Sequence, residues 1–233
     1  MVALLKGLRQ RRFSGQPGWR LINSKYPTVN LIDDIASEAD FDDLYAVAGL
    51  TNPRLLDELD KINLIPRGRR PFGIRGASYA VGPFVHLNPL GSRFTQPGWG
   101  AFYCADSIEV AISETRYHQE RYLRGVGQLA YDDIQMRGLK VTFSARLYDI
   151  TAARHDGKSW YDPDDYAAAR QLGDAVKAAE GDGIFFKSVR HPGGKCYALF
   201  FPDLIGEVIQ TSHYNYRWDG HAISDVYKIS RVR

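Results

Sequence analysis

The sequence predicts a mixed α+β fold in one domain. Segments in which apolar residues recur at helical spacing alternate with short apolar runs that are typical of buried strands, and neither an internal repeat nor a low-complexity tract interrupts them. A chain of 233 residues can bury one substantial core and is short for two cores of ordinary size. We therefore expect a single α+β domain over residues 19–233.

The N-terminal part of the chain combines a lead-in, a strand and a helical insertion. Residues 1–18 are basic and contain Gly15, Pro17 and Gly18, which predicts a flexible lead-in. A strand signal follows at residues 19–22. Residues 30–65 show helical spacing of apolar side chains, and Asn52-Pro53 is a start signal for a second helix inside this stretch. We expect a helical insertion at about residues 30–65.

The central part predicts the start of the main sheet and a long helix. Glycines punctuate residues 72–106, which we interpret as strands and loops that include a strand over residues 101–104. Asp106 is placed to cap the next helix while Glu109 reaches back, and this helix should end near Leu123. Helical geometry then puts Glu114 and His118 on one face.

The C-terminal part predicts four strands, one further helix and an aromatic cluster. The start signal Asp162-Pro163-Asp164-Asp165 precedes the helix. The aromatic cluster over residues 213–220 is expected to close the core rather than to frame a binding site. The strands are expected over residues 139–143, 146–150, 184–189 and 196–201, and the helix over residues 166–179.

Composition and charge exclude several classes of protein. Lys and Arg total 30 against 27 for Asp and Glu, so the net charge of +3 does not resemble a nucleic-acid-binding arm. No apolar run approaches the roughly 18 residues of a membrane span, so we expect a cytoplasmic protein with no membrane contact. The absence of a Walker A loop, a G-x-G-x-x-G fingerprint and an H-E-x-x-H motif disfavours ATP hydrolysis, Rossmann-type hydride transfer and zinc protease chemistry.

The two cysteines, Cys104 and Cys196, have neither metal-ligand spacing nor a C-x-x-C arrangement. Buried free thiols are the favoured interpretation, and a disulfide between them stays open. No metal is expected.

Three residues of the central region could carry chemistry. Arg93 lies in Gly91-Ser92-Arg93-Phe94 and could donate two hydrogen bonds to phosphate oxygens. The commoner outcome for a single arginine is a solvated side chain on the surface. Tyr103 lies within an apolar strand and by itself is more typical of a core tyrosine. Glu114 is either exposed to solvent or used in function, because an unpartnered carboxylate is costly to bury. If it is used in function, it could bind ribose hydroxyls and stabilise oxocarbenium-like charge.

Two further candidates lie outside this region. Arg20, on the first predicted strand, could grip a dinucleotide, against the alternative of an edge-strand arginine. Ser188 ends an apolar strand before a glycine turn, a place where site residues are often displayed; the alternative is a hydroxyl bonded to backbone. No Ser-His-Asp arrangement follows from this spacing, so a nucleophilic serine is not expected.

Taken in order, these motifs resemble the RES-domain family, the toxins of Xre/RES and ParS/ParT-type toxin–antitoxin modules. The resemblance rests on five motifs and spans most of the chain from residue 19. They are Arg-Leu-Ile at Arg20, Gly-Ser-Arg-Phe at Arg93, Phe-Tyr-Cys-Ala at Tyr103, Ala-Ile-Ser-Glu-Thr ending in Glu114 and Thr115, and Lys-Ser-Val-Arg at Ser188.

The resemblance implies an ADP-ribosyltransferase-like fold, with a split β-sheet core and flanking helices, and NAD as the substrate. It implies that Arg20 and Arg93 bind the diphosphate and ribose and that Tyr103 stacks on or orients the nicotinamide side. Glu114 would support the oxocarbenium ion, and Ser188 would hydrogen-bond NAD. It also implies a cognate antitoxin that carries a DNA-binding helix-turn-helix.

We therefore expect an NAD-consuming toxin that cleaves the nicotinamide–ribose bond and transfers ADP-ribose to a protein, with Glu114, Arg93 and Tyr103 as its catalytic residues. An NAD glycohydrolase or phosphorylase that depletes cellular NAD is the closest alternative. An RNA-binding or RNA-cleaving toxin, suggested by Arg67, Arg69 and Arg70, is an alternative of another class. A catalytically silent interaction domain is a third possibility.

Overall fold

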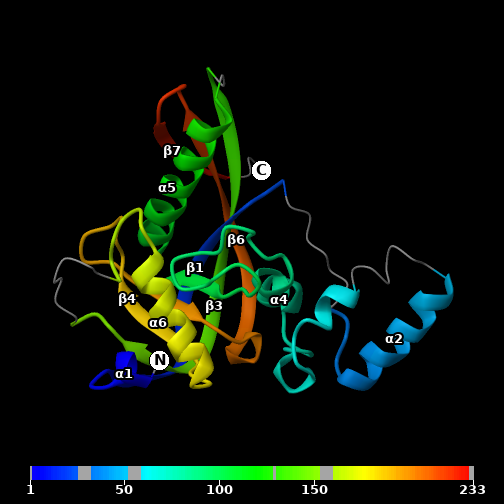
Figure 1. Cartoon of the computed structure of the whole chain (residues 1–233). Helices are drawn as coiled ribbons and strands as arrows, with labels where there is room; N and C mark the ends of the chain where they lie inside the picture. Colours follow the sequence, from blue (N-terminus) through cyan, green and yellow to red (C-terminus); the bar gives the residue numbers. More distant parts are fainter. Residues whose placement is uncertain (1, 26–32, 52–58, 128–129, 153–159, 231–233) are drawn as a thin grey trace.

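A seven-stranded sheet forms the centre of the structure, a computed structural model that describes residues 2–25, 33–51, 59–127, 130–152 and 160–230 (Figure 1). Long strands cross its middle, and shorter strands lie to one side. The strands are β1 (Arg9–Asn23), β2 (Phe102–Ala105), β3 (Asp132–Asp149), β4 (Gly183–Lys187), β5 (Lys195–Leu199), β6 (Ile205–Trp218) and β7 (Ile223–Ile229).

The sheet splits along one edge of β3. Residues 132–143 of β3 pair antiparallel with β6, whereas Tyr148 and Asp149 pair parallel with β4. The strand order is β1-β2-β5-β4-β3-β6-β7, and β1 also pairs with β3 along most of its length, so β1, β2, β5, β4 and β3 close into a ring. The predicted α+β fold with a split sheet and flanking helices is confirmed.

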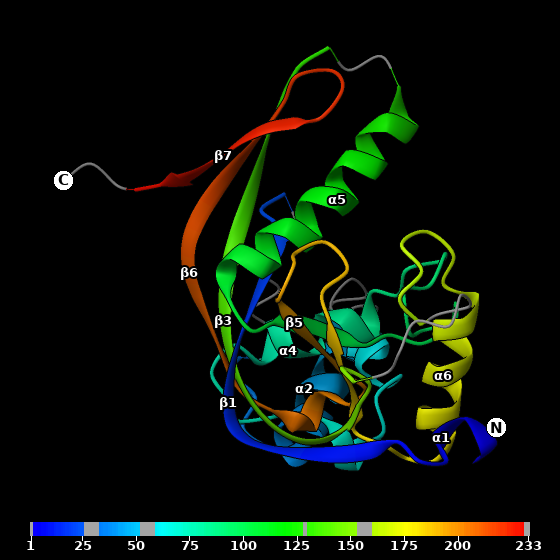
Figure 2. The same cartoon turned by 90° about the vertical axis from the view of Figure 1, so that its left-hand side faces the viewer.

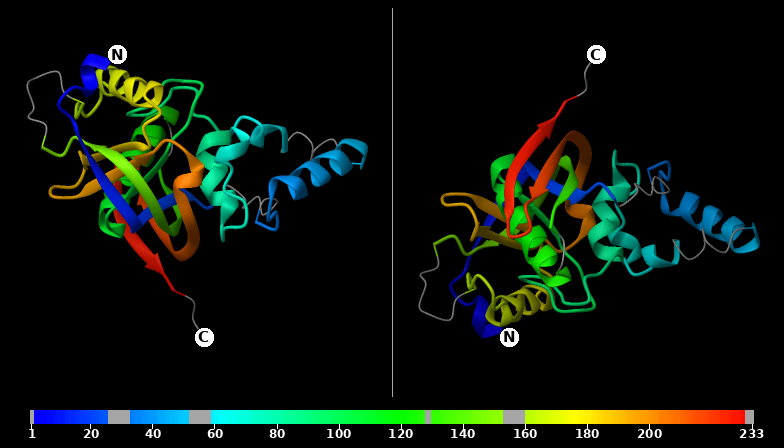
Figure 3. Two further views of the ribbon diagram at one scale, coloured as in Figure 1. Left: turned by 90° about the horizontal axis from the view of Figure 1, so that it is seen from below. Right: turned by 90° about the horizontal axis from the view of Figure 1, so that it is seen from above.

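Helices cover both faces of the sheet. Helix α4 (Ala77–Val85) packs into one hydrophobic cluster, which contains Phe143 and Phe185. Helices α5 (Ile108–Val126) and α6 (Ala167–Ala178) pack into a second cluster, which contains Ile184 and Phe186. Because successive strand residues point to opposite faces, these clusters are two separate cores. Figure 2 shows α5 alongside the long strands β3 and β6. Helix α2 (Glu38–Thr51) projects away from the sheet, and α1 (Val2–Leu5) lies close to α6 (Figure 3).

The two cysteines belong to different cores. Cys104 on β2 packs into the α4 core, and Cys196 on β5 packs into the core under α5. Their strands are neighbours, with Ala105 opposite Cys196, but the two side chains point to opposite faces of the sheet. The disulfide that the sequence left open is therefore not formed, and both thiols are free and buried.

Helix α5 begins one residue later than predicted. Ser107 rather than Asp106 is the N-cap, and its Oγ accepts a hydrogen bond from the Val110 N–H at 3.3 Å. The helix continues past Leu123 to Val126, where Gly127 adopts a φ of 64°. The predicted face is retained, because α5 buries Val110 and Ala111 against the sheet.

The structure corrects two other predictions for the N-terminal half. Residues 9–18 form the first half of β1, paired with β3 from Arg9 opposite Asp149 onwards, rather than a flexible lead-in. Residues 77–85 form α4 rather than strands and loops, because Ala77, Ala80, Val81 and Phe84 bury one helical face in spite of Pro83. The helix start predicted at Asn52-Pro53 lies outside the described residues.

In the C-terminal half, the two strands predicted over residues 139–143 and 146–150 are parts of the single strand β3. The predicted helix over residues 166–179 is confirmed as α6. The aromatic cluster closes the core as expected, with Tyr216 and Trp218 almost fully buried on β6. Within the described ranges, no helix is long and apolar enough to cross a bilayer.

Candidate active site

Glu114 lies on the sheet-facing side of α5 and is partly buried. Its Oε1 accepts a hydrogen bond from Ser188 Oγ at 2.6 Å, and the Cys196 thiol approaches the same oxygen at 3.9 Å. Oε2 accepts no hydrogen bond from the described residues and is not one of the fully buried oxygens that lack a partner. The carboxylate is therefore held through one oxygen while the other stays available.

Ser188 connects Glu114 to the turn between β4 and β5. Its Oγ donates to Glu114 and accepts hydrogen bonds from the N–H groups of Arg190 at 3.1 Å and His191 at 2.9 Å. Gly194 brings this turn against α5, because a Cβ there would lie 2.5 Å from Val110 Cγ2. The hydroxyl thus orients the carboxylate from a turn that is itself fixed.

Tyr103 anchors the loop that carries Arg93. The phenol oxygen bonds to Ser92 Oγ at 2.7 Å and accepts a hydrogen bond from the Phe94 N–H at 3.1 Å. Burial raises the pKa of Tyr103 to about 12, which keeps the hydroxyl protonated at neutral pH. The loop turns sharply at Gly91, which has a φ of 68°. The Tyr103 hydroxyl therefore makes its hydrogen bonds within the loop. An interaction of the ring with nicotinamide stays a prediction.

The Arg93 side chain is held between a backbone segment and an aromatic ring. The residue is 9% exposed, its Nη1 donates to the carbonyl oxygens of Trp160 at 3.2 Å and Asp162 at 2.8 Å, and its guanidinium lies 4.4 Å from the centre of the Tyr166 ring. Nε and Nη2 donate to no group in the described part of the chain, and neither is a fully buried atom without a partner. The free side of the fork can thus accept a ligand.

Glu114 and Arg93 both influence the pKa values of His118 and Cys196. The pKa of His118 is lowered, mainly because protein atoms displace water from around its ring. Glu114 opposes this shift, whereas the positive charges of Arg190, Arg93 and Arg121 add to it. The pKa of the Cys196 thiol is raised by burial and by Glu114, and Arg93 opposes that shift. Both charges therefore lie within electrostatic reach of the same two side chains.

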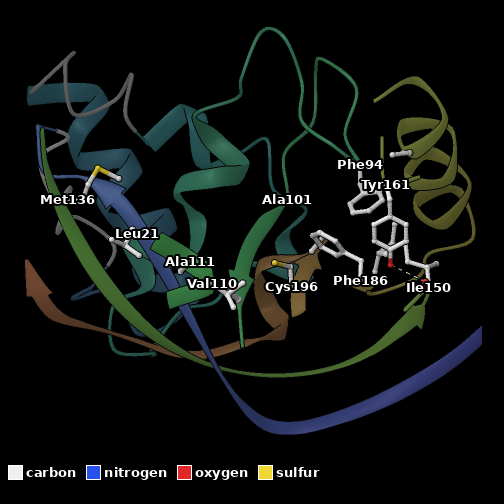
Figure 4. Packing of buried hydrophobic residues seen from close by; sticks show 14 of the residues in the cluster. Leu21, Phe94, Ala101, Val110, Ala111, Met136, Ile150, Tyr161, Phe186 and Cys196 are labelled. Carbon is white, nitrogen blue, oxygen red and sulfur yellow. Dashed lines mark hydrogen bonds between the residues drawn. The ribbon is translucent and has the colours of Figure 1, made fainter. Parts of the chain in front are cut away.

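Packing supports this placement. Phe94, next to Arg93, belongs to the same core cluster as Val110 and Cys196. Figure 4 shows Phe94, Phe186 and Cys196 following one another toward Val110 of α5, and the Phe94 and Phe186 rings are 4.9 Å apart. The structure thus brings Arg93, Tyr103, Glu114 and Ser188 to the α5 face of the sheet.

The family model for the RES domain matches residues 70–219 of this chain. The chain belongs to the RES-domain family. A relative described as uncharacterized protein y4oC, from Sinorhizobium fredii (strain NBRC 101917 / NGR234), is 30% identical over 212 residues, which cover 90% of this chain and 86% of the relative.

Among solved structures, the M. tuberculosis MbcT–MbcA toxin–antitoxin complex contains a chain with a TM-score of 0.46 and 12% identity. The alignment covers 90% of this chain and 91% of that one. A likeness this loose supports no conclusion about the present RES domain.

Arg20 is the one candidate that the structure does not bring to the RES-domain site. It lies outside the matched residues, its Nη1 donates to the Tyr103 carbonyl oxygen at 2.7 Å, and its guanidinium lies 4.9 Å from the centre of the Phe102 ring. Phe102 belongs to the α4 core, on the face opposite Cys196. In this structure Arg20 braces β2 from the other face, so its contacts correct the expectation that it lies beside Arg93.

A second arginine, which the sequence did not indicate, supports the Arg93 loop. Arg170 on α6 donates from Nε to the Ser92 carbonyl oxygen at 3.0 Å and from Nη2 to the Leu90 carbonyl oxygen at 2.7 Å. Helix α6 comes close enough for this because a Cβ at Gly173 would lie 1.8 Å from the Phe94 carbonyl oxygen. A glycine inside a helix with an apolar face is the signal that could have indicated this close approach.

Three contacts near Glu114 were not predicted either. The Tyr117 hydroxyl donates to Asp164 Oδ1 at 2.5 Å, and the Arg190 guanidinium lies 3.3 Å from the centre of the Tyr117 ring and donates to the Pro163 carbonyl oxygen. Together these contacts hold Pro163 and Asp164 against α5 and the β4–β5 turn. No sequence motif indicated them, because they depend on how the RES domain folds the segment before α6 over the site.

Proposed function

We propose that this RES-domain protein is an NAD-consuming toxin that cleaves the nicotinamide–ribose bond and transfers ADP-ribose to a protein acceptor. The observation that carries the proposal is a carboxylate oriented by a hydroxyl, Glu114 with Ser188 at 2.6 Å, on the face that also holds the partly free guanidinium of Arg93. Family membership adds the expectation of NAD as substrate and of a cognate antitoxin with a helix-turn-helix.

The residues present suit this substrate. An arginine with unused N–H groups can bind a diphosphate, and a carboxylate with one free oxygen can stabilise the positive charge that develops on the ribose when nicotinamide leaves. The mechanism would be dissociative, so the protein contributes orientation and charge rather than a nucleophile. Hydrolysis or phosphorolysis would use the same residues with a different acceptor. No metal is required in this proposal.

The RNA-directed alternative loses its main support. Each arginine of the basic connector is paired with a carboxylate: Arg67 with Asp42, Arg69 with Asp203 and Arg70 with Glu38, at 2.8, 2.9 and 3.0 Å. The Arg70 side chain is also only 4% exposed. These charges are therefore used to hold the segment around α2 to the rest of the molecule.

Replacing Glu114 by Gln tests the proposal, because the amide keeps the size of the side chain and removes its charge. We expect nicotinamide release from NAD to fall by at least about 100-fold, and growth arrest to be relieved. The assay measures nicotinamide with and without cell extract as a source of acceptor. Glu109→Gln, an exposed glutamate in the first turn of the same helix, is the matched control. Near-normal turnover in Glu114→Gln would refute the proposal, and consumption of RNA instead of NAD by the parent protein would favour the alternative.

A further inference from the structure

Two arginines from different elements point at one short backbone segment. Arg93, from the loop before β2, donates to the carbonyl oxygens of Trp160 and Asp162, and Arg190, from the β4–β5 turn, donates to the carbonyl oxygen of Pro163. Three carbonyl oxygens within residues 160–163 thus accept hydrogen bonds from the two guanidinium groups, while Nε and Nη2 of Arg93 stay unused.

Neither arginine is ion-paired with a carboxylate in the described part of the chain, although both lie close to the Glu114 site. Their charges together oppose protonation of His118, one turn along α5 from Glu114. The Asp162 carboxylate accepts hydrogen bonds from the N–H groups of Asp165 and Asp164, which are the main causes of its lowered pKa; the charge of Arg93 lowers this pKa further without an ion pair. Carbonyl dipoles bind guanidinium groups less strongly than phosphate oxygens do.

The same segment is tied down at its other end. Tyr117 donates to Asp164 Oδ1 at 2.5 Å, and Asp165 Oδ1 accepts a hydrogen bond from the Ala167 N–H at 2.8 Å at the start of α6. Toward the site, Arg93 and Arg190 each donate to backbone carbonyl oxygens of the segment. The Arg190 guanidinium also packs on the Tyr117 ring.

Tyr161 is buried in the core under α5, and its hydroxyl donates to the Ile150 carbonyl oxygen and accepts from the Lys187 N–H, so this residue anchors the segment. Displacement of residues 162–164 alone breaks a few polar contacts and leaves this anchor in the core.

We propose that Arg190 is a second anion-binding residue of the site, beside Arg93, and that residues 162–164 form a strap whose carbonyl oxygens accept hydrogen bonds from both guanidinium groups until a diphosphate displaces them. The identity of the diphosphate as that of NAD rests on the proposed function. The strap competes with the ligand for the same donors, so weakening the strap should strengthen ligand binding, whereas removing Arg190 should weaken it.

Binding of NAD and of inorganic pyrophosphate would be measured by calorimetry with the full chain in the Glu114→Gln background, where turnover is not expected. Tyr117→Phe keeps the ring beneath Arg190 and loses the hydrogen bond to Asp164. We expect its Kd for both probes to fall by about threefold to tenfold. Arg190→Met keeps an unbranched stem without donors, and its Kd should rise by about tenfold or more. Arg121→Met removes an exposed charge that also acts on His118 and controls for the general positive potential.

The outcomes separate the two parts of the proposal. Tighter binding by Arg190→Met would show that Arg190 only closes the strap, and an unchanged Kd would show that it binds no anion; either result overturns its assigned role. An unchanged Kd in Tyr117→Phe would overturn the strap alone. Hydrogen exchange should also speed up in residues 162–166 when pyrophosphate binds, and unaltered exchange would contradict displacement.

Failure of the proposed function would be visible separately. If the parent protein binds pyrophosphate in an Arg190-dependent way and does not bind NAD, the anion pair stands and the NAD assignment falls. If it binds neither probe, both fall.

Discussion

At the scale of single residues, two hydroxyl groups of the candidate site hold other residues of the site in place. Ser188 orients Glu114, and Tyr103 fixes the loop that presents Arg93. Sequence patterns indicate that Glu114 is either exposed or used in function; the structure shows it partly buried and bonded to Ser188, and its part in catalysis stays a prediction. Proximity of Glu114 and Ser188, which are 74 positions apart, could not follow from local patterns, because it depends on the β4–β5 turn reaching α5.

Ser188→Ala removes the donor to Glu114 and the acceptor of two backbone N–H groups. We expect kcat for nicotinamide release to fall by about tenfold or more, because the carboxylate is no longer held, and the free energy of unfolding to fall by about 1–3 kcal/mol. Steady-state kinetics and urea unfolding measure the two effects. Ser113→Ala removes a hydroxyl of α5 that bonds to His191 and not to Glu114, so it serves as the control. Full activity of Ser188→Ala would contradict the orienting role.

At the scale of elements, those with strong local signals were predicted well. The helix from Tyr166 has an acidic start and an apolar face, and the helix that carries Glu114 has a cap and a glycine stop. Helix α4 was missed because Gly76, Gly82 and Pro83 suggested loops, and the first half of β1 was missed because its arginines and glycines resemble a tail. In α4 the burial of one helical face overrides local propensity, and in the first half of β1 the pairing with β3 does so. The supports from α6 and the β4–β5 turn could not be predicted, since they arise only when elements meet.

Gly173→Ala tests the contact between α6 and the Arg93 loop. A Cβ there would lie 1.8 Å from a backbone oxygen, so the helix must move away and withdraw Arg170 from its two carbonyl acceptors. We expect a loss of about 1–3 kcal/mol in the free energy of unfolding and a higher KM for NAD. Gly125→Ala on α5 meets nothing within 4 Å and should be neutral or slightly stabilising. Equal stability and equal KM in the two variants would show that the close approach has no effect on the loop.

At the scale of the whole molecule, tyrosines buried in or beside the two cores link stability to alkaline pH. Burial raises the pKa values of Tyr103, Tyr161 and Tyr197 to about 12, from an ordinary value of 10.0. The folded state therefore holds these protons more tightly than the unfolded state does. Their contribution to stability is complete below pH 10 and is lost as the pH rises toward 12.

We expect the free energy of unfolding to fall between pH 10 and 12 by on the order of 2 kcal/mol per buried tyrosine. Urea unfolding at pH 9 and pH 11 measures the loss, and absorbance of the phenolate form reports how many tyrosines titrate. Tyr161→Phe should reduce the pH dependence, whereas Tyr227→Phe, which alters an exposed ring on β7, should not. A free energy of unfolding that stays constant up to pH 11 would contradict this account.

The ring of strands also sets when the molecule can first become active. Strand β1 leaves the ribosome well before its partner β3, which begins at residue 132, and β5, which completes the ring, ends at Leu199. Until those residues have emerged, the nascent chain lacks both the sheet and the turn that carries Ser188. Translation therefore delays the assembly of the Glu114 site until β5 has been made. For a protein proposed to harm its own cell, that interval gives a partner made at the same time the chance to bind first.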